Sequence, residues 1–149
     1  MMFTTQQLKP TNDRPVRPRV AAALAACCFV VTAFRAALTL GAPFGAAALG
    51  GATAGQLSDA LRLVTGFATV VWFIAALLVL VRGGAPLVPG LRALSGVGTW
   101  VLVGLLGIGT LMNFASSSPW ERSGWGPFTL VMFVLGVVLA RSGPAHPTV

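Results

Sequence analysis

The chain has 149 residues, of which 56% are hydrophobic and only 9% are charged, and its formal net charge is +7. Soluble domains carry about 25% charged residues, so this chain has too few polar side chains to cover a soluble surface, and the composition predicts one membrane domain. The basic residues flank the apolar runs instead of forming one face, which favours membrane topology over a nucleic-acid partner.

Residues 1–19 are polar, contain three prolines and end in a basic cluster, so they are expected to form a disordered cytoplasmic tail. The stretch "VAAALAACC" that follows also imitates a signal peptide, and "LAAC" resembles a lipoprotein cleavage site. Only seven apolar residues precede Cys27, at the lower limit of a signal sequence. An uncleaved first span is therefore preferred, with cleavage or lipidation as the alternative. Adjacent Cys27 and Cys28 form no CxxC motif and are expected to pack as small apolar side chains.

Four segments are long and apolar enough, or nearly so, to cross a bilayer, which takes about 20 residues. They are residues 20–40, 60–82, 93–114 and 125–141. None alternates strictly, so the sequence predicts an all-α integral membrane protein. The short connections favour an up-down-up-down four-helix bundle over residues 20–141, followed by a short C-terminal tail at 142–149.

The distribution of basic residues predicts the orientation of these spans. One side of the membrane collects Lys9, Arg14, Arg17, Arg19, Arg82, Arg92 and Arg141, and the other collects Arg35, Arg62 and Arg122. Seven against three places both termini in the cytoplasm of a multi-pass plasma-membrane protein. In the third span, Gly104 and Gly107 share a face and are expected to admit a neighbouring helix, but the GxxxG spacing occurs only outside the spans.

Two loops are expected to face outward. The first, "GAPFGAAALGGATAGQLSD", is rich in glycine and is expected to be a flexible or re-entrant turn. The alternative is a backbone-lined site or tight packing against the second loop. In the second loop, "SPWE" predicts a capping box in which Ser118 and Glu121 satisfy each other's backbone N–H groups. Gly124, Gly126 and Pro127 are expected to interrupt the helix, and Trp120 and Trp125 to lie at the headgroup level.

Polar and charged side chains concentrate at this outer level of a chain that is otherwise apolar. The candidate cluster comprises Arg35, Asp59, Arg62, Asn113, Ser117, Ser118, Glu121 and Arg122. Pairing of Arg35 with Asp59 or Glu121 would lower the free energy needed to bury its charge, so a structural ion-pair network is the first interpretation. A site for an anionic lipid headgroup or a small anion is the alternative, since three cations exceed two anions.

Two stretches, "GAPFGAAALGG" and "MNFASSSPWERSGWGPFTLVMFVLGVVLA", together with the four spans, resemble small four-span membrane proteins of actinobacteria that have no established activity. The matching positions are Gly41, Ala42, Pro43, Phe44, Gly45, Gly50, Gly51, Asn113, Ser117, Ser118, Glu121 and Pro127. This family often has Trp or Leu in place of Phe44, and Pro where this chain reads "SDA". The resemblance covers most of residues 20–141 and implies topology only.

No catalytic residue, cofactor or metal site is predicted. The single histidine, His146, is in the C-terminal tail, so a histidine-based triad or metal site outside the membrane is excluded by count. The preferred function is non-enzymatic: a packing, scaffold or accessory subunit in the lipid bilayer, with a membrane-protein partner or a second copy of itself. The alternatives are a transporter or channel component, a protein that binds an anion or anionic lipid at the outer cluster, and a membrane enzyme acting at the outer surface.

Overall fold

The computed structural model describes residues 16–87 and 90–143, and every regular element in these ranges is helical. The four long helices are α1 (Pro18–Thr39), α2 (Asp59–Arg82), α3 (Leu91–Ala115) and α4 (Gly126–Ala140). Between α1 and α2 lie two short 3-10 turns, η1 (Gly45–Ala47) and η2 (Leu49–Gly51). A π-helical turn, η3 (Glu121–Trp125), runs directly into α4.

The predicted all-α fold is confirmed, because four helical segments are long and apolar enough to cross a membrane. Their ends lie within about two residues of the ranges expected from hydropathy. Helix α1 begins at Pro18, so Arg19 belongs to the first helix and not to the N-terminal tail. Residues 1–15 and 144–149 lie outside the described residues. The predictions of a disordered N-terminal tail and a short C-terminal tail therefore lie largely outside them as well.

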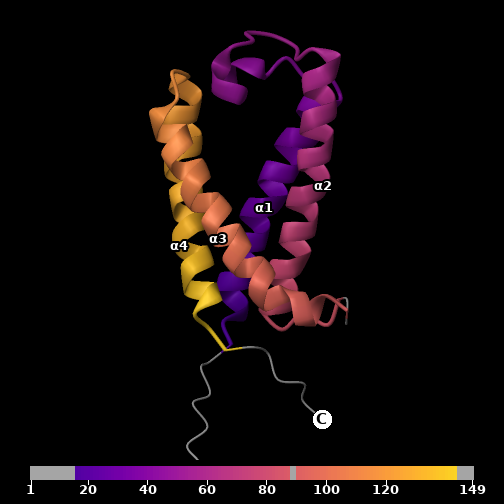
Figure 1. Ribbon diagram of the computed structural model, residues 1–149, viewed down its shortest axis with the longest axis vertical. Coiled ribbons are helices and arrows are strands. Elements are labelled where there is room, and N and C mark those ends of the chain that lie inside the picture. The colour runs from indigo at the N-terminus through magenta and orange to yellow at the C-terminus, as the bar shows by residue number, and fades with distance from the viewer. Residues whose placement is uncertain (1–15, 88–89, 144–149) are drawn as a thin grey trace, which may run out of the picture.

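The helices pack as two pairs, α1 with α2 and α3 with α4. Figure 1 shows the α1–α2 connection and the turn from α3 to α4 at one end of the molecule, and the α2–α3 connection at the other. The two pairs lie close together at the end that carries the α2–α3 connection and stand apart at the end that carries the other two (Figure 1). This divergence positions the candidate site described below.

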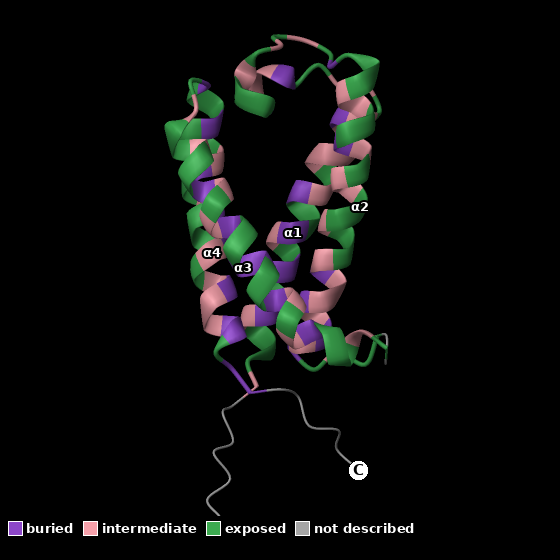
Figure 2. Ribbon diagram, viewed as in Figure 1, coloured by how far each residue is buried: buried purple, intermediate pink, exposed green. Residues whose placement is uncertain are grey.

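The surface of the helices is apolar, and several polar side chains are inside. Leu63, Phe67 and Leu111 are exposed, whereas Thr65 and Thr99 are buried, and Figure 2 shows exposed residues along the outward faces of the helices. The buried hydroxyls bond to backbone carbonyls of their own helices, as when Thr99 Oγ1 donates to Ser95 O at 2.6 Å. This pattern is compatible with an integral membrane protein, because lipid favours exposed hydrocarbon and hydrogen-bonded polar groups.

At the end with the α2–α3 connection, Arg82 joins α2 to the end of α4. Its Nη2 donates to Ala140 O at 3.3 Å and to Ser142 O at 2.7 Å. These carbonyls lie at the C-terminus of α4, where the helix dipole favours a cation. The contact therefore fastens the two helix pairs to each other at the end where they converge.

Candidate functional site: a cavity beneath a hydrogen-bonded cap

The first connection folds onto the second at the divergent end of the bundle. Ser118 Oγ donates to Ala46 O at 2.7 Å, and Trp125 Nε1 donates to Ala47 O at 3.0 Å. We call residues 45–51 together with residues 116–125 the outer cap. The structure shows the stated alternative to a flexible or re-entrant turn, which is tight packing of the first loop against the second.

Gly50 joins the two halves of the outer cap through both of its backbone polar groups. Its N–H donates to Glu121 Oε1 at 3.0 Å, and its carbonyl accepts from Ser117 Oγ at 3.2 Å. Gly50 and Glu121 are 71 positions apart in the chain. Glu121 is consequently buried, with 8% of its surface exposed, although it lies in the first turns of a helix at the end of the bundle.

The predicted capping box is only half formed. Glu121 N donates to Ser118 Oγ at 3.4 Å, as the motif requires. The Glu121 carboxylate does not return to Ser118, because it accepts from Gly50, and Ser118 N donates instead to Ser116 Oγ at 3.1 Å. The Glu121 carboxylate thus makes a contact with the first connection in place of the local contact with Ser118 N–H.

The predicted interruption before the fourth span is also wrong. The chain stays helical from Pro119 to Ala140, and the π turn Glu121–Trp125 ends two residues before Pro127. Proline lacks an N–H and its ring clashes with the carbonyl four residues earlier in an α-helix. A wider π turn at this place lets the helix continue through residues that normally end one.

A cavity of about 630 Å³ lies beneath the outer cap, between the two helix pairs. It is lined by Val31, Phe34, Arg35, Ala47, Ala48, Leu49, Gly50, Trp72, Leu105, Leu106, Gly109, Met112, Asn113, Ala115, Ser116, Ser117, Glu121, Trp125 and Thr129. Val31 and Leu106 also belong to the buried core, so the cavity has an apolar floor. Its volume is in the range of ligand-binding pockets, about 300–1,000 Å³.

Arg35 brings a positive charge to the wall of this cavity from the last turns of α1. Among residues 16–87 and 90–143, no side chain or carbonyl oxygen accepts a hydrogen bond from its guanidinium, and no carboxylate lies within 4.0 Å of it. Glu121 lines the same cavity but is bonded to Gly50. The ion pair expected between Arg35 and either Asp59 or Glu121 is therefore not formed.

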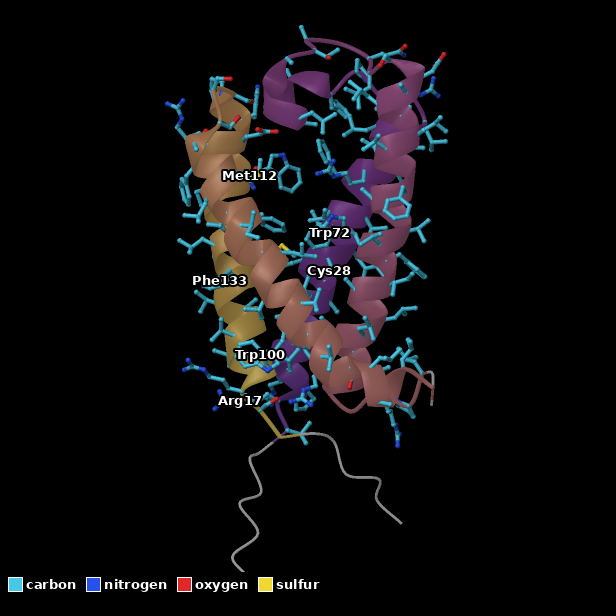
Figure 3. The ribbon with its side chains drawn as sticks, viewed as in Figure 1. Arg17, Cys28, Trp72, Trp100, Met112 and Phe133 are labelled. Atoms are coloured by element: carbon cyan, nitrogen blue, oxygen red, sulfur yellow. The ribbon has the colours of Figure 1, made fainter. Side chains whose placement is uncertain are left out.

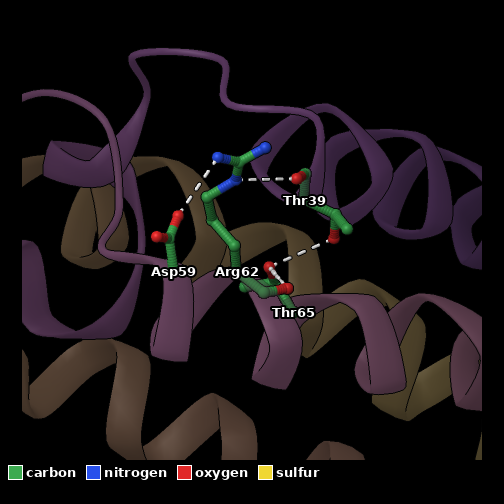
Figure 4. Close-up of polar contacts among 4 residues, drawn as sticks. All are labelled: Thr39, Asp59, Arg62 and Thr65. Atoms are coloured by element: carbon green, nitrogen blue, oxygen red, sulfur yellow. Dashed lines mark hydrogen bonds and ion pairs between the residues drawn. The ribbon is translucent and has the colours of Figure 1, made fainter.

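Asp59 and Arg62 form a separate contact that ties α2 to α1 (Figure 4). Arg62 Nη1 lies 3.4 Å from Asp59 Oδ1, and Arg62 Nε donates to Thr39 O at 2.9 Å. The hydroxyls of Thr39 and Thr65 lie 3.1 Å apart beside this pair. Asp59 and Arg62 do not line the cavity, so the predicted cluster divides into two groups.

Of the remaining predicted residues, some line the cavity and others do not. Asn113 lines the cavity and its Nδ2 donates to Thr129 Oγ1 at 3.2 Å. Arg122 is exposed, and its Nη2 donates to Ser116 O at 2.8 Å. Of the eight predicted residues, the structure brings Arg35, Asn113, Ser117 and Glu121 to the cavity, with Ser118 in the cap above it.

Sequence reasoning missed the aromatic wall of the cavity. Trp125 was expected at the headgroup level, but its ring lies 4.8 Å from that of Phe34, centre to centre, inside the bundle. Trp120 has 67% of its surface exposed, and its expected position at the headgroup level stays a prediction. Trp72 also lines the cavity, and nothing in its uniformly apolar segment distinguishes it from a lipid-facing residue.

The expected role of the two glycines of the third span is half right. A Cβ at Gly107 would lie 3.2 Å from Phe133 of α4, so this glycine does admit a neighbouring helix. Gly104 has no atom within 4 Å of such a Cβ and is exposed. Gly107 therefore packs against α4, whereas Gly104 lies at the surface, although the two glycines were expected to share one face.

Comparison of the chain with protein-family models, curated proteins and solved structures found no match. The resemblance to small actinobacterial four-span proteins accordingly remains a prediction. Within the part of the chain that the structure describes, no group of three His, Cys, Asp or Glu side chains can hold a metal ion. His146 lies outside the described residues. The cavity and its unpaired arginine are thus the features from which a function can be argued.

Proposed function

We propose that this protein is a four-span integral membrane protein that binds a molecule bearing an anionic group in the cavity beneath the outer cap, without catalysing a reaction. The observation that carries the proposal is Arg35, a cation on the wall of a largely apolar cavity with no ion-pair partner among the described residues. An ionisable side chain within a membrane-spanning segment is costly and is by default a sign of function. A bound anion would supply the missing partner.

The proposed orientation puts the outer cap on the extracytoplasmic side of the plasma membrane and both termini in the cytoplasm. Support comes from the ends of the helices. Arg17, Arg19, Arg82, Arg92 and Arg141 flank the spans at the end opposite the outer cap. An excess of basic residues marks the cytoplasmic side of membrane proteins. A bacterial source of the actinobacterial type belongs to the same proposal, on the resemblance alone.

The accessory or packing role preferred from the sequence ranks second after this proposal. The cavity gives the alternative of an anion or lipid site a specific location, whereas no described feature identifies a protein partner. A transport role has less support, because the cavity ends on the buried core residues Val31 and Leu106.

Native mass spectrometry of the protein extracted gently from its own membrane tests the proposal. We expect the wild-type protein to retain a molecule with a phosphate, sulfate or carboxylate group. Arg35→Gln should lower its occupancy or affinity about 10- to 100-fold, since hydrogen bonds to charged groups contribute about 1.5–3 kcal/mol. Arg141→Gln removes the same charge from an exposed side chain at the opposite end of the bundle and is the matched control.

Equal retention by the wild type and Arg35→Gln would contradict the proposed site. A stoichiometric protein partner without any retained anion would instead favour the accessory role.

A further inference from the structure

The cavity is lined by two opposite charges that do not form a contact ion pair. Arg35 and Glu121 both line it, yet their charged atoms are more than 4.0 Å apart. Each comes from a different part of the chain, the end of α1 and the π turn before α4. Two opposite charges held apart on the wall of one cavity complement a ligand that itself carries both signs.

Glu121 retains hydrogen-bonding capacity toward such a ligand. Its Oε1 accepts from Gly50 N–H at 3.0 Å, and no described residue donates to its Oε2. An ionised carboxylate can accept about four hydrogen bonds. A group with several N–H donors and a positive charge, such as a primary ammonium, would satisfy this remaining capacity. A quaternary ammonium would supply the charge but no donor.

The rim of the cavity faces the surface that the bilayer would cover. Leu105 and Met112 of α3 line the cavity while 55% and 68% of their surfaces are exposed, so they lie at its edge. Met112 and Trp72, which line the cavity from α3 and α2, are labelled in Figure 3. The outer cap crosses the aqueous end, where it is held by its hydrogen bonds. Access is therefore easiest from the side, through hydrocarbon.

We propose that the ligand is a zwitterionic lipid with a primary amine, which enters the cavity from the bilayer beside α3. Its phosphate lies at Arg35 and its ammonium at Glu121, with Asn113 close to the headgroup, and its two hydrocarbon chains leave past Leu105 and Met112. This inference rests on the proposed function and goes beyond it by naming the charge pattern of the ligand and its route.

The test compares three lipids of equal chain length, added to the delipidated full-length protein in a neutral detergent. Phosphatidylethanolamine carries the phosphate and a primary ammonium, phosphatidylglycerol lacks the ammonium, and phosphatidylcholine has an ammonium without N–H donors. We expect the wild type to bind phosphatidylethanolamine about tenfold more tightly than the other two, as one charge-assisted hydrogen bond contributes about 1.5 kcal/mol.

Two substitutions then assign the two charges. Arg35→Gln should weaken binding of all three lipids, whereas Glu121→Gln should lower the affinity for phosphatidylethanolamine to about that for phosphatidylglycerol. The amide oxygen introduced by Glu121→Gln still accepts from Gly50 N–H, so the outer cap keeps this contact. Asp59→Asn removes an acid from the same end of the bundle but outside the cavity, and it should change nothing.

An N-acetylated phosphatidylethanolamine gives the same information on the unmodified protein, should Glu121→Gln disturb folding. Its amide carries no charge, so we expect its affinity to match that of phosphatidylglycerol.

If the wild type binds phosphatidylglycerol as tightly as phosphatidylethanolamine, or more tightly, the ligand is not required to be zwitterionic. That result would contradict this inference but would still support an anion site at Arg35. Binding of inorganic phosphate at Arg35 with no binding of any of the three lipids would show that the ligand is not a lipid. It would also contradict the proposed entry from the bilayer. Binding of none of these probes would overturn this inference and the proposed function together.

Discussion

Gly50 and Gly51, at the centre of the outer cap, have φ of 79° and 72°, in the left-handed region that favours glycine. At Gly50 the conformation turns the N–H toward Glu121 and the carbonyl toward Ser117. At Gly51 there is also no room, because a Cβ would lie 2.9 Å from Ser118 Cβ. The glycine pair is therefore a requirement of the cap and not a sign of flexibility.

Gly51→Ala should accordingly lower the free energy of unfolding by about 2 kcal/mol, since the left-handed conformation alone costs about 1–2 kcal/mol for a residue with a Cβ. Thermal unfolding in detergent measures the change. Gly55→Ala is the matched control, because a Cβ there meets no atom within 4 Å and its φ is not positive. Equal losses in the two variants would show that the cap does not depend on this close approach.

The sequence could place Arg35 and Glu121 at the same level of the bundle but could not give their partners. The hydrophobic pattern and the cap motif are local signals, and they located the helix ends and the contact from Glu121 N–H to Ser118. The bond from Gly50 to the Glu121 carboxylate joins residues far apart in the chain. Because hydropathy does not specify how α1 and α4 diverge, neither this bond nor the cavity could be predicted.

Among the elements, α4 shows how a helix continues through residues that usually end one. Gly124, Gly126 and Pro127 predicted a break, yet the π turn Glu121–Trp125 carries the chain into α4 without one. The turn also presents Glu121 and Trp125 to the first connection. A propensity scale treats glycine and proline singly and therefore cannot show that a π turn accommodates them together.

Close packing between elements gives a second stability prediction. A Cβ on buried Gly83, at the end of α2, would overlap Ala21 Cβ in α1. Because Ala21 is held in α1 and the Gly83 N–H is bonded to Val79 O at the end of α2, Gly83→Ala should destabilise the protein by about 1–3 kcal/mol, the usual range for overpacking.

Gly104→Ala on the exposed face of α3 is the comparison for this prediction, also by thermal unfolding. Its added Cβ meets no atom within 4 Å, and alanine favours a helix over glycine by about 0.5–1 kcal/mol. We expect this variant to be as stable as the wild type or slightly more stable. A loss at Gly104 as large as that at Gly83 would indicate that α3 has a close neighbour on this face.

For the whole molecule, the proposed orientation is tested by cysteine labelling in intact cells. With Cys27 and Cys28 replaced by alanine, Ser123→Cys places a thiol on the exposed surface of the outer cap, and Arg141→Cys places one at the opposite end of the bundle. A membrane-impermeant maleimide should label Ser123→Cys directly and Arg141→Cys only after permeabilisation. The reverse result would invert the orientation, although it would leave the fold unchanged.

The floor of the cavity has an electrical consequence. Beneath it, Leu24, Cys28, Val79, Leu102 and Met132 close the space among all four helices. The buried Thr99 hydroxyl deeper in the bundle already donates its proton to Ser95 O, so it has no hydrogen-bond donor left for an anion. A charged species that reached the cavity would thus face hydrocarbon on its inner side. The protein forms a blind recess in an insulator, and a bilayer that contains it should keep its resistance to current.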